Sequence, residues 1–279
     1  MRMGQSQDPA APQLVRATLP GGRRATLYAN LGPLLDHNGR LTGVLFAAED
    51  RSEELGSAAE SPEHGAEERR LIDALRRYLG EGIAHAVVNR ASFVGLGGVA
   101  QQVSVLHADV RGYTTVAEAL PPAAVTELLL RFHGAAVRAL QGEGATLDRF
   151  IGDAVLAIWN APQLQPGHVR MALRGALALR AATMAQGTEL GYGVGVHTGE
   201  AVVGNLGSEE FMNYTAVGDT VNIAARLQAA AAVGEVVCSG SALAAAGPGI
   251  HAVSLGLLTV KGRTAPVEAY RVDGMEAGD

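Results

Sequence analysis

Cysteine, lysine and long apolar runs are nearly missing from this 279-residue sequence. The single cysteine, Cys238, excludes an intrachain disulfide framework and fits a reducing compartment. No run of about 18 apolar residues occurs, since Arg174 and Arg180 interrupt the Ala/Leu-rich stretch 171–185. The polar N-terminus also has no apolar signal core. These absences predict a soluble, cytoplasmic protein without a membrane partner.

Positive charge is scarce and is nearly all arginine. The chain has 21 arginines but one lysine, Lys261, and its net charge is −6. Because no long basic run occurs, nucleic acid is not an expected partner. Neither a G-x-x-x-x-G-K-S/T loop nor a G-x-G-x-x-G loop is present, so phosphates would not be cradled in either of those ways.

The first part of the chain, residues 13–52, has the pattern of a small β segment. The His-Asn-Gly turn at 37–39 separates Gly32–Asp36 from Leu41–Ala48, which predicts a strand hairpin. The segment "GPLLDHNGRLTGVLFAAEDRSEE" is similar to the closing strands of a PAS sensor domain, without that domain's front half. The alternative is a small β extension that binds no ligand.

Residues 53–98 are expected to connect this segment to the rest of the chain. Their first part, to residue 66, is charged and rich in Gly, Ser and Ala, as in a loose linker. An amphipathic helix is predicted next, because apolar residues recur every fourth position: Leu71, Leu75, Leu79, Ile83 and Val87. This helix either pairs two chains as a signalling helix or docks on its own domain.

Residues 101–273 have the pattern of one α+β domain. The predicted order is β-α-β-β-α-β followed by additional elements, which is typical of a ferredoxin-like core with extra strands. The first strand is predicted at Gln102–Asp109, and the first long helix ends near Gln141. Further elements are expected as strands at 144–150, 153–159, 191–197, 200–205, 235–238, 253–260 and 266–271, and as helices at 168–185 and from Asp219 onward.

Two carboxylates stand at strand ends beside glycine. Asp109 occurs in "LHADVRGYT" and Asp153 in "RFIGDAVLAIW". Mg²⁺ in proteins takes one or two carboxylates together with substrate phosphates, and two such ions can clamp an in-line displacement at phosphorus. Either aspartate alone would be an ordinary turn residue, but the pair is a candidate metal site.

A helix begins at "GDTVNIAARLQ" and supplies a second polar pair. Asn222 and Arg226 are four residues apart, so they lie on one helix face, one turn from each other. An amide beside a guanidinium suits a ribose and a phosphate oxyanion. Without other features, the same pair would be solvated surface.

Several segments together resemble class III adenylate and guanylate cyclases. They occur in that family's order and at about its spacing: "VSVLHADVRGYTTVAEAL", "LDRFIGDAVLAIWNAP", "GVGVHTGEAVVGNLGS" and "NYTAVGDTVNIAARL". The later segment "LTVKGRTAPVEAYRV" is similar to the family's closing strands, so the likeness covers about 101–272. One such motif is moderately specific, whereas this set in register is highly specific.

The resemblance implies a role for each matching residue. Asp109 and Asp153 look like the two metal-binding aspartates, joined by the Val110 carbonyl, and imply two Mg²⁺ or Mn²⁺ ions per site. Asn222 looks like the asparagine that orients the ribose, and Arg226 like the arginine that stabilises charge at the α-phosphate.

The sole lysine also falls in a family motif. Lys261, in "VKG", looks like the lysine that contacts the terminal phosphates. An ammonium and a guanidinium are not interchangeable, which is a reason for keeping one lysine in an arginine-rich chain.

The base-reading positions of the family fall on Arg149 and Thr215. Adenylate cyclases typically have Lys and Asp there, with Thr in one subgroup, and guanylate cyclases have Glu and Cys. Thr215 fits the Thr-bearing adenylate subgroup, whereas Arg149 departs from the pattern. Arginine has donors only, so it reaches adenine N1 but cannot accept from guanine N1 and N2, whereas it can donate to guanine O6. The Thr215 hydroxyl can accept a hydrogen bond from adenine N6 or donate one to guanine O6, so it does not distinguish the two bases. ATP is therefore the expected substrate.

The resemblance also implies a dimer. In the family, one domain supplies the metal aspartates and the other supplies the base-reading residues, Asn and Arg. This chain has both sets, so a homodimer with two equivalent sites is expected. The expected reaction is ATP to 3′,5′-cyclic AMP and pyrophosphate. The alternatives are a guanylate cyclase and a catalytically weak, nucleotide-binding regulatory module.

Overall fold

The computed structural model describes residues 13–18, 24–35, 41–50, 62–89, 93, 95–187, 189–259 and 266–276. It divides into two compact units, Met1–Ala74 and Leu75–Asp279. Within these described ranges, no helix is both long enough and apolar enough to cross a membrane.

The N-terminal unit contains a three-stranded antiparallel sheet. Its strands β1 (Gln13–Thr18), β2 (Arg24–Leu35) and β3 (Leu41–Asp50) pair in sequence order. The predicted hairpin is confirmed, since β2 and β3 pair along their length up to Leu35 and Leu41. Its turn, 36–40, lies outside the described residues, and the PAS-like character of the segment stays a prediction.

The predicted connecting helix is divided in two. Helix α2 (Pro62–Leu79) and helix α3 (Glu81–Asn89) are separated by Gly80, whose φ is +78°. This left-handed conformation ends α2, and glycine adopts it without steric cost. Ile83 in α3 is buried while Leu71 in α2 is exposed, so the expected stripe is not buried along its length.

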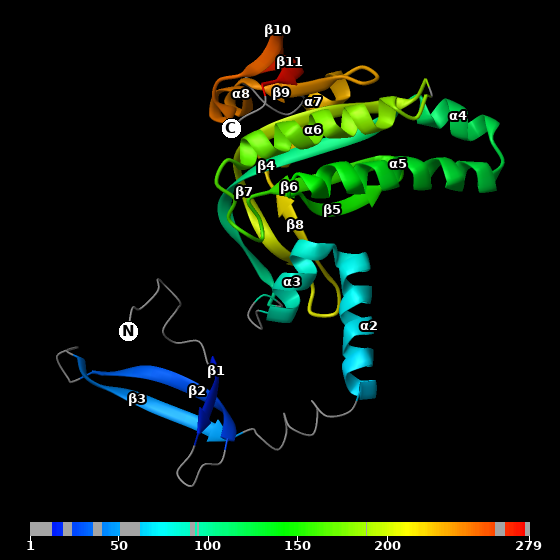
Figure 1. The fold of residues 1–279 in the computed structure, drawn as a ribbon. Helices are drawn as coiled ribbons and strands as arrows, with labels where there is room; N and C mark the ends of the chain where they lie inside the picture. Colours follow the sequence, from blue (N-terminus) through cyan, green and yellow to red (C-terminus); the bar gives the residue numbers. More distant parts are fainter. Residues whose placement is uncertain are drawn as a thin grey trace. The chain divides into compact units, whose positions relative to one another are not determined.

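An eight-stranded sheet forms the body of the larger unit (Figure 1). The strand order is β10-β11-β9-β7-β4-β6-β5, with β8 paired to β7. The strands are β4 (Gly97–Arg111), β5 (Thr146–Ile151), β6 (Ala154–Trp159), β7 (Gly191–Gly207), β8 (Met212–Val217), β9 (Val236–Ser239), β10 (Ile250–Leu258) and β11 (Val267–Met275). The central order β7-β4-β6-β5 is that of a ferredoxin-like core, as predicted.

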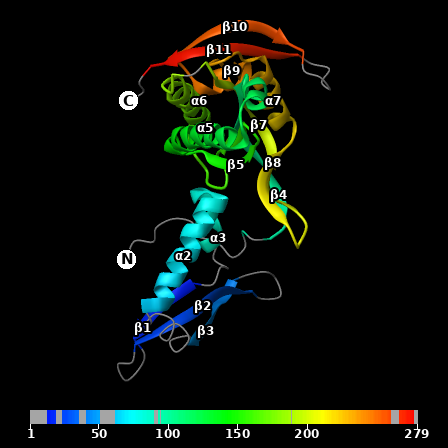
Figure 2. The ribbon, with the colours of Figure 1, turned by 90° about the vertical axis from the view of Figure 1, so that its right-hand side faces the viewer.

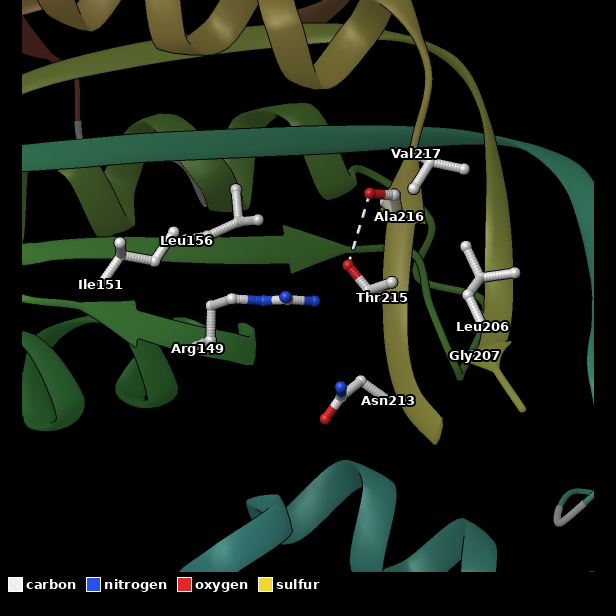
Figure 3. Close-up of a pocket in the computed structure, with 9 residues that line it drawn as sticks. All are labelled: Arg149, Ile151, Leu156, Leu206, Gly207, Asn213, Thr215, Ala216 and Val217. Atoms are coloured by element: carbon white, nitrogen blue, oxygen red, sulfur yellow. Dashed lines mark hydrogen bonds between the residues drawn. The ribbon is translucent and has the colours of Figure 1, made fainter. Parts of the chain in front are cut away.

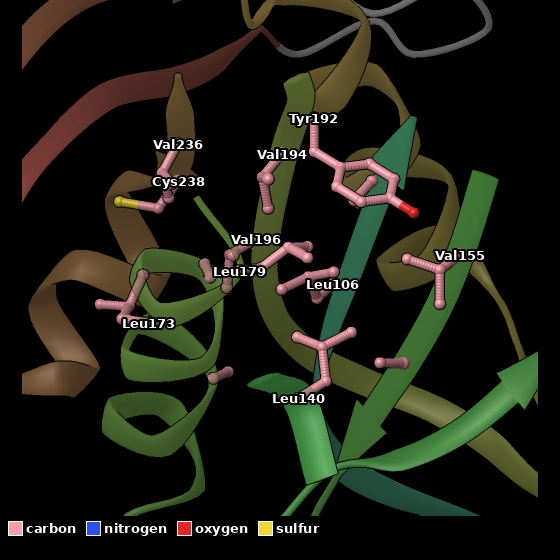
Figure 4. Packing of buried hydrophobic residues seen from close by; sticks show 14 of the residues in the cluster. Leu106, Leu140, Val155, Leu173, Leu179, Tyr192, Val194, Val196, Val236 and Cys238 are labelled. Carbon is pink, nitrogen blue, oxygen red and sulfur yellow. The ribbon is translucent and has the colours of Figure 1, made fainter. Parts of the chain in front are cut away.

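Helices cover both faces of this sheet (Figures 1 and 2). Helices α5 (Pro122–Gly142) and α6 (His168–Met184) lie on one face, and α7 (Asp219–Ala230) lies on the other. Strand β4 alternates accordingly: Leu106 and Ala108 join the α5/α6 core, while Val103 and Val105 join the core under α7. Figure 4 shows the first of these cores. Buried on two faces, β4 is a rigid support for Asp109 near its end.

One further prediction of local structure is wrong, and three elements of this unit were not predicted. The two strands expected at 191–197 and 200–205 are one continuous strand, β7. Strand β8 and the short helices α4 (Tyr113–Ala119) and α8 (Gly240–Ala246) were not predicted. The two helices have only seven residues each, which is too short for a clear helical period.

Gly195 allows α7 to lie directly on β7. A Cβ at this position would overlap the Ala224 carbonyl oxygen and the Gln228 backbone nitrogen. No side chain can move aside to relieve that overlap, because both obstructing atoms belong to the helix backbone. The position of α7, and of the polar residues on it, therefore depends on this glycine.

We expect Gly195→Ala to destabilise the domain by about 3 kcal/mol, because overpacking forces the backbone to shift. Gly142→Ala is the matched control: Gly142 ends α5 and a Cβ there meets nothing within 4 Å. That control should not lose stability, since alanine is the better helix former. Denaturant unfolding of the two variants measures the difference, and equal stabilities would contradict this packing account.

Candidate active site

The two predicted metal aspartates lie close together at one end of the central strands. Asp109 is two residues from the end of β4 and pairs with Gly193 of β7. Asp153 stands in the turn between β5 and β6, after Gly152 with φ +61°. Because β4 and β6 are neighbours, paired at Ala108 and Val155, the fold brings both carboxylates to the same place.

The pKa of Asp153 responds to its burial and to the nearby Asp109. Burial raises the pKa of the Asp153 carboxyl, and the Asp109 carboxylate raises it further. Backbone N–H groups, including that of Val110, donate to this carboxyl and oppose the shift. Two carboxylates that repel each other in a half-buried site are stabilised by a cation between them.

His133 of α5 holds the turn that contains Asp153. Its Nε2 donates to the Gly152 carbonyl oxygen over 2.9 Å, and its ring stacks on Phe150 with 4.0 Å between centroids. His133 was not predicted as part of the site, because it lies on a helix 19 residues before Gly152.

The donor set fits a hard divalent cation. The described residues contain no group of three or more His, Cys, Asp or Glu side chains that would close a protein cage. Two carboxylates with an open remaining sphere suit Mg²⁺ or Mn²⁺, which bind water and phosphate oxygens there. The buried Tyr192 hydroxyl has no hydrogen-bond partner among the described residues. Burial and the charges of both aspartates raise the pKa of this hydroxyl, which is therefore a polar group near the pair.

Arg111 connects the aspartates to α7. Its Nη1 lies 3.7 Å from Asp109 Oδ1, and its Nε donates to the Ala231 carbonyl over 3.0 Å. Its Nη2 also donates to the Gln228 carbonyl. The guanidinium therefore satisfies carbonyls at the C-terminal end of α7, where a positive charge also complements the helix dipole. Sequence reasoning missed this residue, which follows directly after Val110.

Asn222 and Arg226 lie on the outer face of α7. Both are exposed, while Ile223, Ala224 and Leu227 face the sheet. The structure confirms the helix and the shared face. In the hydrogen bonds of the described residues, neither side chain contacts Asp109 or Asp153 of the same chain.

The predicted base-reading residues share a pocket (Figure 3). Its volume is about 450 Å³, and its walls come from β5, β6, β7 and β8. The lining residues are Arg149, Ile151, Leu156, Leu206, Gly207, Asn213, Thr215, Ala216 and Val217. Figure 3 shows the Arg149 guanidinium extending toward Thr215 across the pocket. An apolar pocket with a few convergent polar groups is the usual form of a base site.

Asp148 lies behind these two residues and was not predicted. Its side chain is only 1% exposed, and its Oδ1 accepts a hydrogen bond from Arg149 Nε over 2.6 Å. The Thr215 hydroxyl donates to its Oδ2. Thr215 is 67 residues away in the sequence, so no local pattern indicates this contact.

Lys261 lies outside the described residues, as does the rest of 260–265. Its predicted contact with terminal phosphates therefore stays a prediction.

The family model for the adenylate and guanylate cyclase catalytic domain matches residues 98–274. The chain belongs to this family. The eight-stranded sheet, the aspartate pair and the exposed polar pair on α7 therefore lie within the catalytic domain of a class III nucleotide cyclase.

Relatives of this cyclase domain include proteins named adenylate cyclase and proteins named guanylyl cyclase. Adenylate cyclase 1 of Rhizobium meliloti is 31% identical over 217 residues, which is 74% of this chain and 33% of that protein. The guanylyl cyclase Cya2 has a TM-score of 0.61 at 31% identity, covering 64% of this chain and 95% of that one. The adenylyl cyclase CyaB of P. aeruginosa has a TM-score of 0.59 at 30% identity, covering 66% and 100%. This chain spans about a third of the length of the curated relatives it matches.

We expect Asp153→Asn to stabilise the cyclase domain in the absence of divalent metal. The pKa of Asp153 in the folded state lies above its ordinary value. At a pH above the folded-state pKa, the charged carboxylate therefore destabilises the folded state. This destabilisation is lost as the pH falls below the ordinary pKa, because the carboxyl is then protonated in both states. Asparagine removes the charge and keeps an oxygen for the Val110 N–H. At neutral pH, Tm should rise by about 1–3 °C. Adding Mg²⁺ or Mn²⁺ should raise the Tm of the original protein but not of the variant. A lower Tm for the metal-free variant would contradict this electrostatic account.

Proposed function

We propose that this cyclase converts ATP to 3′,5′-cyclic AMP and pyrophosphate at a site shared by two copies of the chain. The observation that supports ATP most directly is the pocket in which Arg149 and Thr215 face each other. A guanidinium has donors only, so it pairs with adenine N1, an acceptor, and not with the guanine N1–H and N2–H₂ edge. A site that leaves buried purine donors unpaired discriminates against that purine.

The α7 residues act on the sugar and the α-phosphate in this proposal. The Asn222 amide orients the ribose by hydrogen bonds so that the 3′-hydroxyl is in line with the α-phosphorus. The 3′ oxygen forms the new bond to phosphorus as the bond to the pyrophosphate oxygen breaks, and the proton of the 3′-hydroxyl is released to water. The Arg226 guanidinium neutralises the negative charge that grows on the α-phosphate oxygens. Lys261 holds the terminal phosphates.

The aspartates act on the metal in this proposal. Asp109, Asp153 and the Val110 carbonyl would hold the cations, two per site. Bound Mg²⁺ or Mn²⁺ lowers the pKa of the 3′-hydroxyl and neutralises phosphate charge. The Val110 N–H holds the Asp153 carboxyl in place, and His133 supports the turn beneath it.

The positions of these groups support the dimer in this proposal. Asn222 and Arg226 face outward from α7, and the lining of the Arg149–Thr215 pocket includes neither aspartate among the described residues. A second copy related by a two-fold axis brings the aspartates of one chain to the purine pocket and α7 face of the other. The same symmetry creates two equivalent sites.

Product formation tests this function. Purified protein is incubated with ATP and Mg²⁺ or Mn²⁺, and 3′,5′-cyclic AMP and pyrophosphate are measured. Equal amounts of both are expected, with Asp153→Asn as the inactive control. Nucleotide binding without turnover under every condition would instead favour a non-catalytic regulatory module.

A further inference from the structure

The Asp148 carboxylate is buried behind the purine pocket and accepts hydrogen bonds from both base-reading side chains. Its two oxygens are used separately: Oδ1 accepts from Arg149 Nε over 2.6 Å, and Oδ2 accepts from the Thr215 hydroxyl. The side chain is 1% exposed, whereas that of Arg149 is 41% exposed. A buried carboxylate is expensive unless it is paired and hydrogen-bonded, and here its partners are the residues that face the base.

A β-bulge makes this arrangement possible. Leu147 pairs with Ala157 and Arg149 with Leu156, so Asp148 is the extra residue in the β5–β6 ladder. Successive residues of a regular strand point to opposite faces, which would separate Asp148 from Arg149. A bulge re-aims side chains locally, and Asp148 is thereby brought into contact with both Arg149 and Thr215.

The contact with Asp148 determines whether the Thr215 hydroxyl acts as a hydrogen-bond donor or acceptor toward the base. A hydroxyl has one proton, and an ionised carboxylate accepts only, so the proton of Thr215 points at Asp148. Its oxygen also lies 3.4 Å from the Ala216 carbonyl oxygen, but that contact is much the longer of the two (Figure 3). The Thr215 oxygen therefore presents lone pairs to the base. This oxygen can accept a hydrogen bond from an amino group at purine C6, but the hydroxyl cannot donate one to a carbonyl at C6.

Asp148 also restricts Arg149. Its hydrogen bond uses the Nε–H, which leaves the two terminal nitrogens of the guanidinium for the base. A guanidinium that is already held by Asp148 loses less side-chain entropy when the base binds than a guanidinium that is not held.

We propose that Asp148 is a positioning residue that makes the purine pocket adenine-selective, by fixing Thr215 as an acceptor and Arg149 as an oriented donor. This inference rests on the proposed adenylate cyclase activity. It adds the reason why the threonine, which by itself accepts from adenine or donates to guanine, favours adenine here.

Substrate analogues test the Thr215 orientation in the unaltered protein. ATP has an amino group at C6, purine riboside triphosphate has hydrogen, and inosine triphosphate has a carbonyl oxygen. We expect kcat/KM to fall in that order. Purine riboside lacks the amino group that donates to Thr215, while in inosine the carbonyl faces the lone pairs of Thr215 and the N1–H faces the donors of Arg149. If inosine triphosphate is used as well as or better than purine riboside triphosphate, while ATP is still preferred to GTP, the hydroxyl donates and the proposal is overturned.

Asp148→Asn tests the carboxylate itself. An amide offers one acceptor and one donor group, and Arg149 Nε–H can only donate, so the amide oxygen must face Arg149 and the amide NH₂ must face Thr215. The hydroxyl then accepts from the amide and donates to the base. The ratio of kcat/KM for inosine triphosphate to that for purine riboside triphosphate should rise about tenfold, the effect of one hydrogen bond.

A control variant makes the result decisive. Glu143→Gln neutralises another arginine-paired carboxylate, 2.7 Å from Arg174 Nε and outside the pocket lining, and should leave the ratio unchanged. An unchanged ratio in folded Asp148→Asn would overturn the proposal, and if that variant does not fold, the analogue order in the unaltered protein decides. Preference for GTP, or no cyclic product, would instead refute the proposed function.

Discussion

Asp109→Ala and Asn222→Ala proteins should each be inactive alone and should regain activity when mixed. Each substitution removes one half of both sites in a symmetric dimer, and we expect each variant to lose about 10³-fold or more in kcat. In a mixed dimer one site takes both lesions and the other takes none. With free exchange of chains in an equimolar mixture, half of the dimers are mixed, so activity should return to about a quarter of the original.

The control for this mixing experiment uses two lesions on the same half of the site. Asp109→Ala mixed with Asp153→Asn should stay inactive, because each site of a mixed dimer takes both aspartates from one chain. Exchange of chains is verified by native mass spectrometry. If folded, dimerising Asp109→Ala and Asn222→Ala proteins exchange chains and no activity returns, the shared-site proposal is wrong.

Arg226→Ala should lower kcat by about 10²–10⁴-fold with only a small change in KM, because a cation that stabilises transition-state charge contributes mainly to the chemical step. Arg226→Lys should recover little, since an ammonium does not reproduce the planar fork of a guanidinium. Arg226 is exposed on α7, so both variants should unfold within about 0.5 kcal/mol of the original protein.

Steady-state kinetics and Tm measurements check this expectation for Arg226. Arg131→Ala, which removes another exposed helical arginine, should leave kcat unchanged. A rise in KM with kcat intact for Arg226→Ala would show that this arginine binds substrate and transition state equally.

Much of the cyclase fold could be predicted because its elements have clear periods. The strand predicted at Gln102–Asp109 lies within β4, whose residues Leu106 and Val105 belong to the cores on its two faces. Asp109 and Asp153 were found because each stands near a strand end with a glycine within three residues, and the strand order brings them together. The spacing of Asn222 and Arg226 correctly placed both on one exposed face of α7.

The differences come from contacts that are not local. Gly80 divides the expected helix, because one left-handed residue ends α2 despite the four-residue spacing of apolar residues on either side. Asp148 was missed because its role depends on a bulge in β5 and on a threonine of β8, a strand that was itself not predicted. Arg111 was missed because its partners are carbonyls at the end of α7, more than 100 residues later.

The central claim, an adenylate cyclase rather than a guanylate cyclase, is tested most directly by offering ATP and GTP together at equal concentration with Mg²⁺ and, separately, with Mn²⁺. The ratio of the two cyclic products then equals the ratio of kcat/KM values. We predict cyclic AMP in excess of cyclic GMP by about tenfold or more with either metal. Cyclic GMP in equal or greater amount would contradict the proposed reading of the base by Arg149, Thr215 and Asp148.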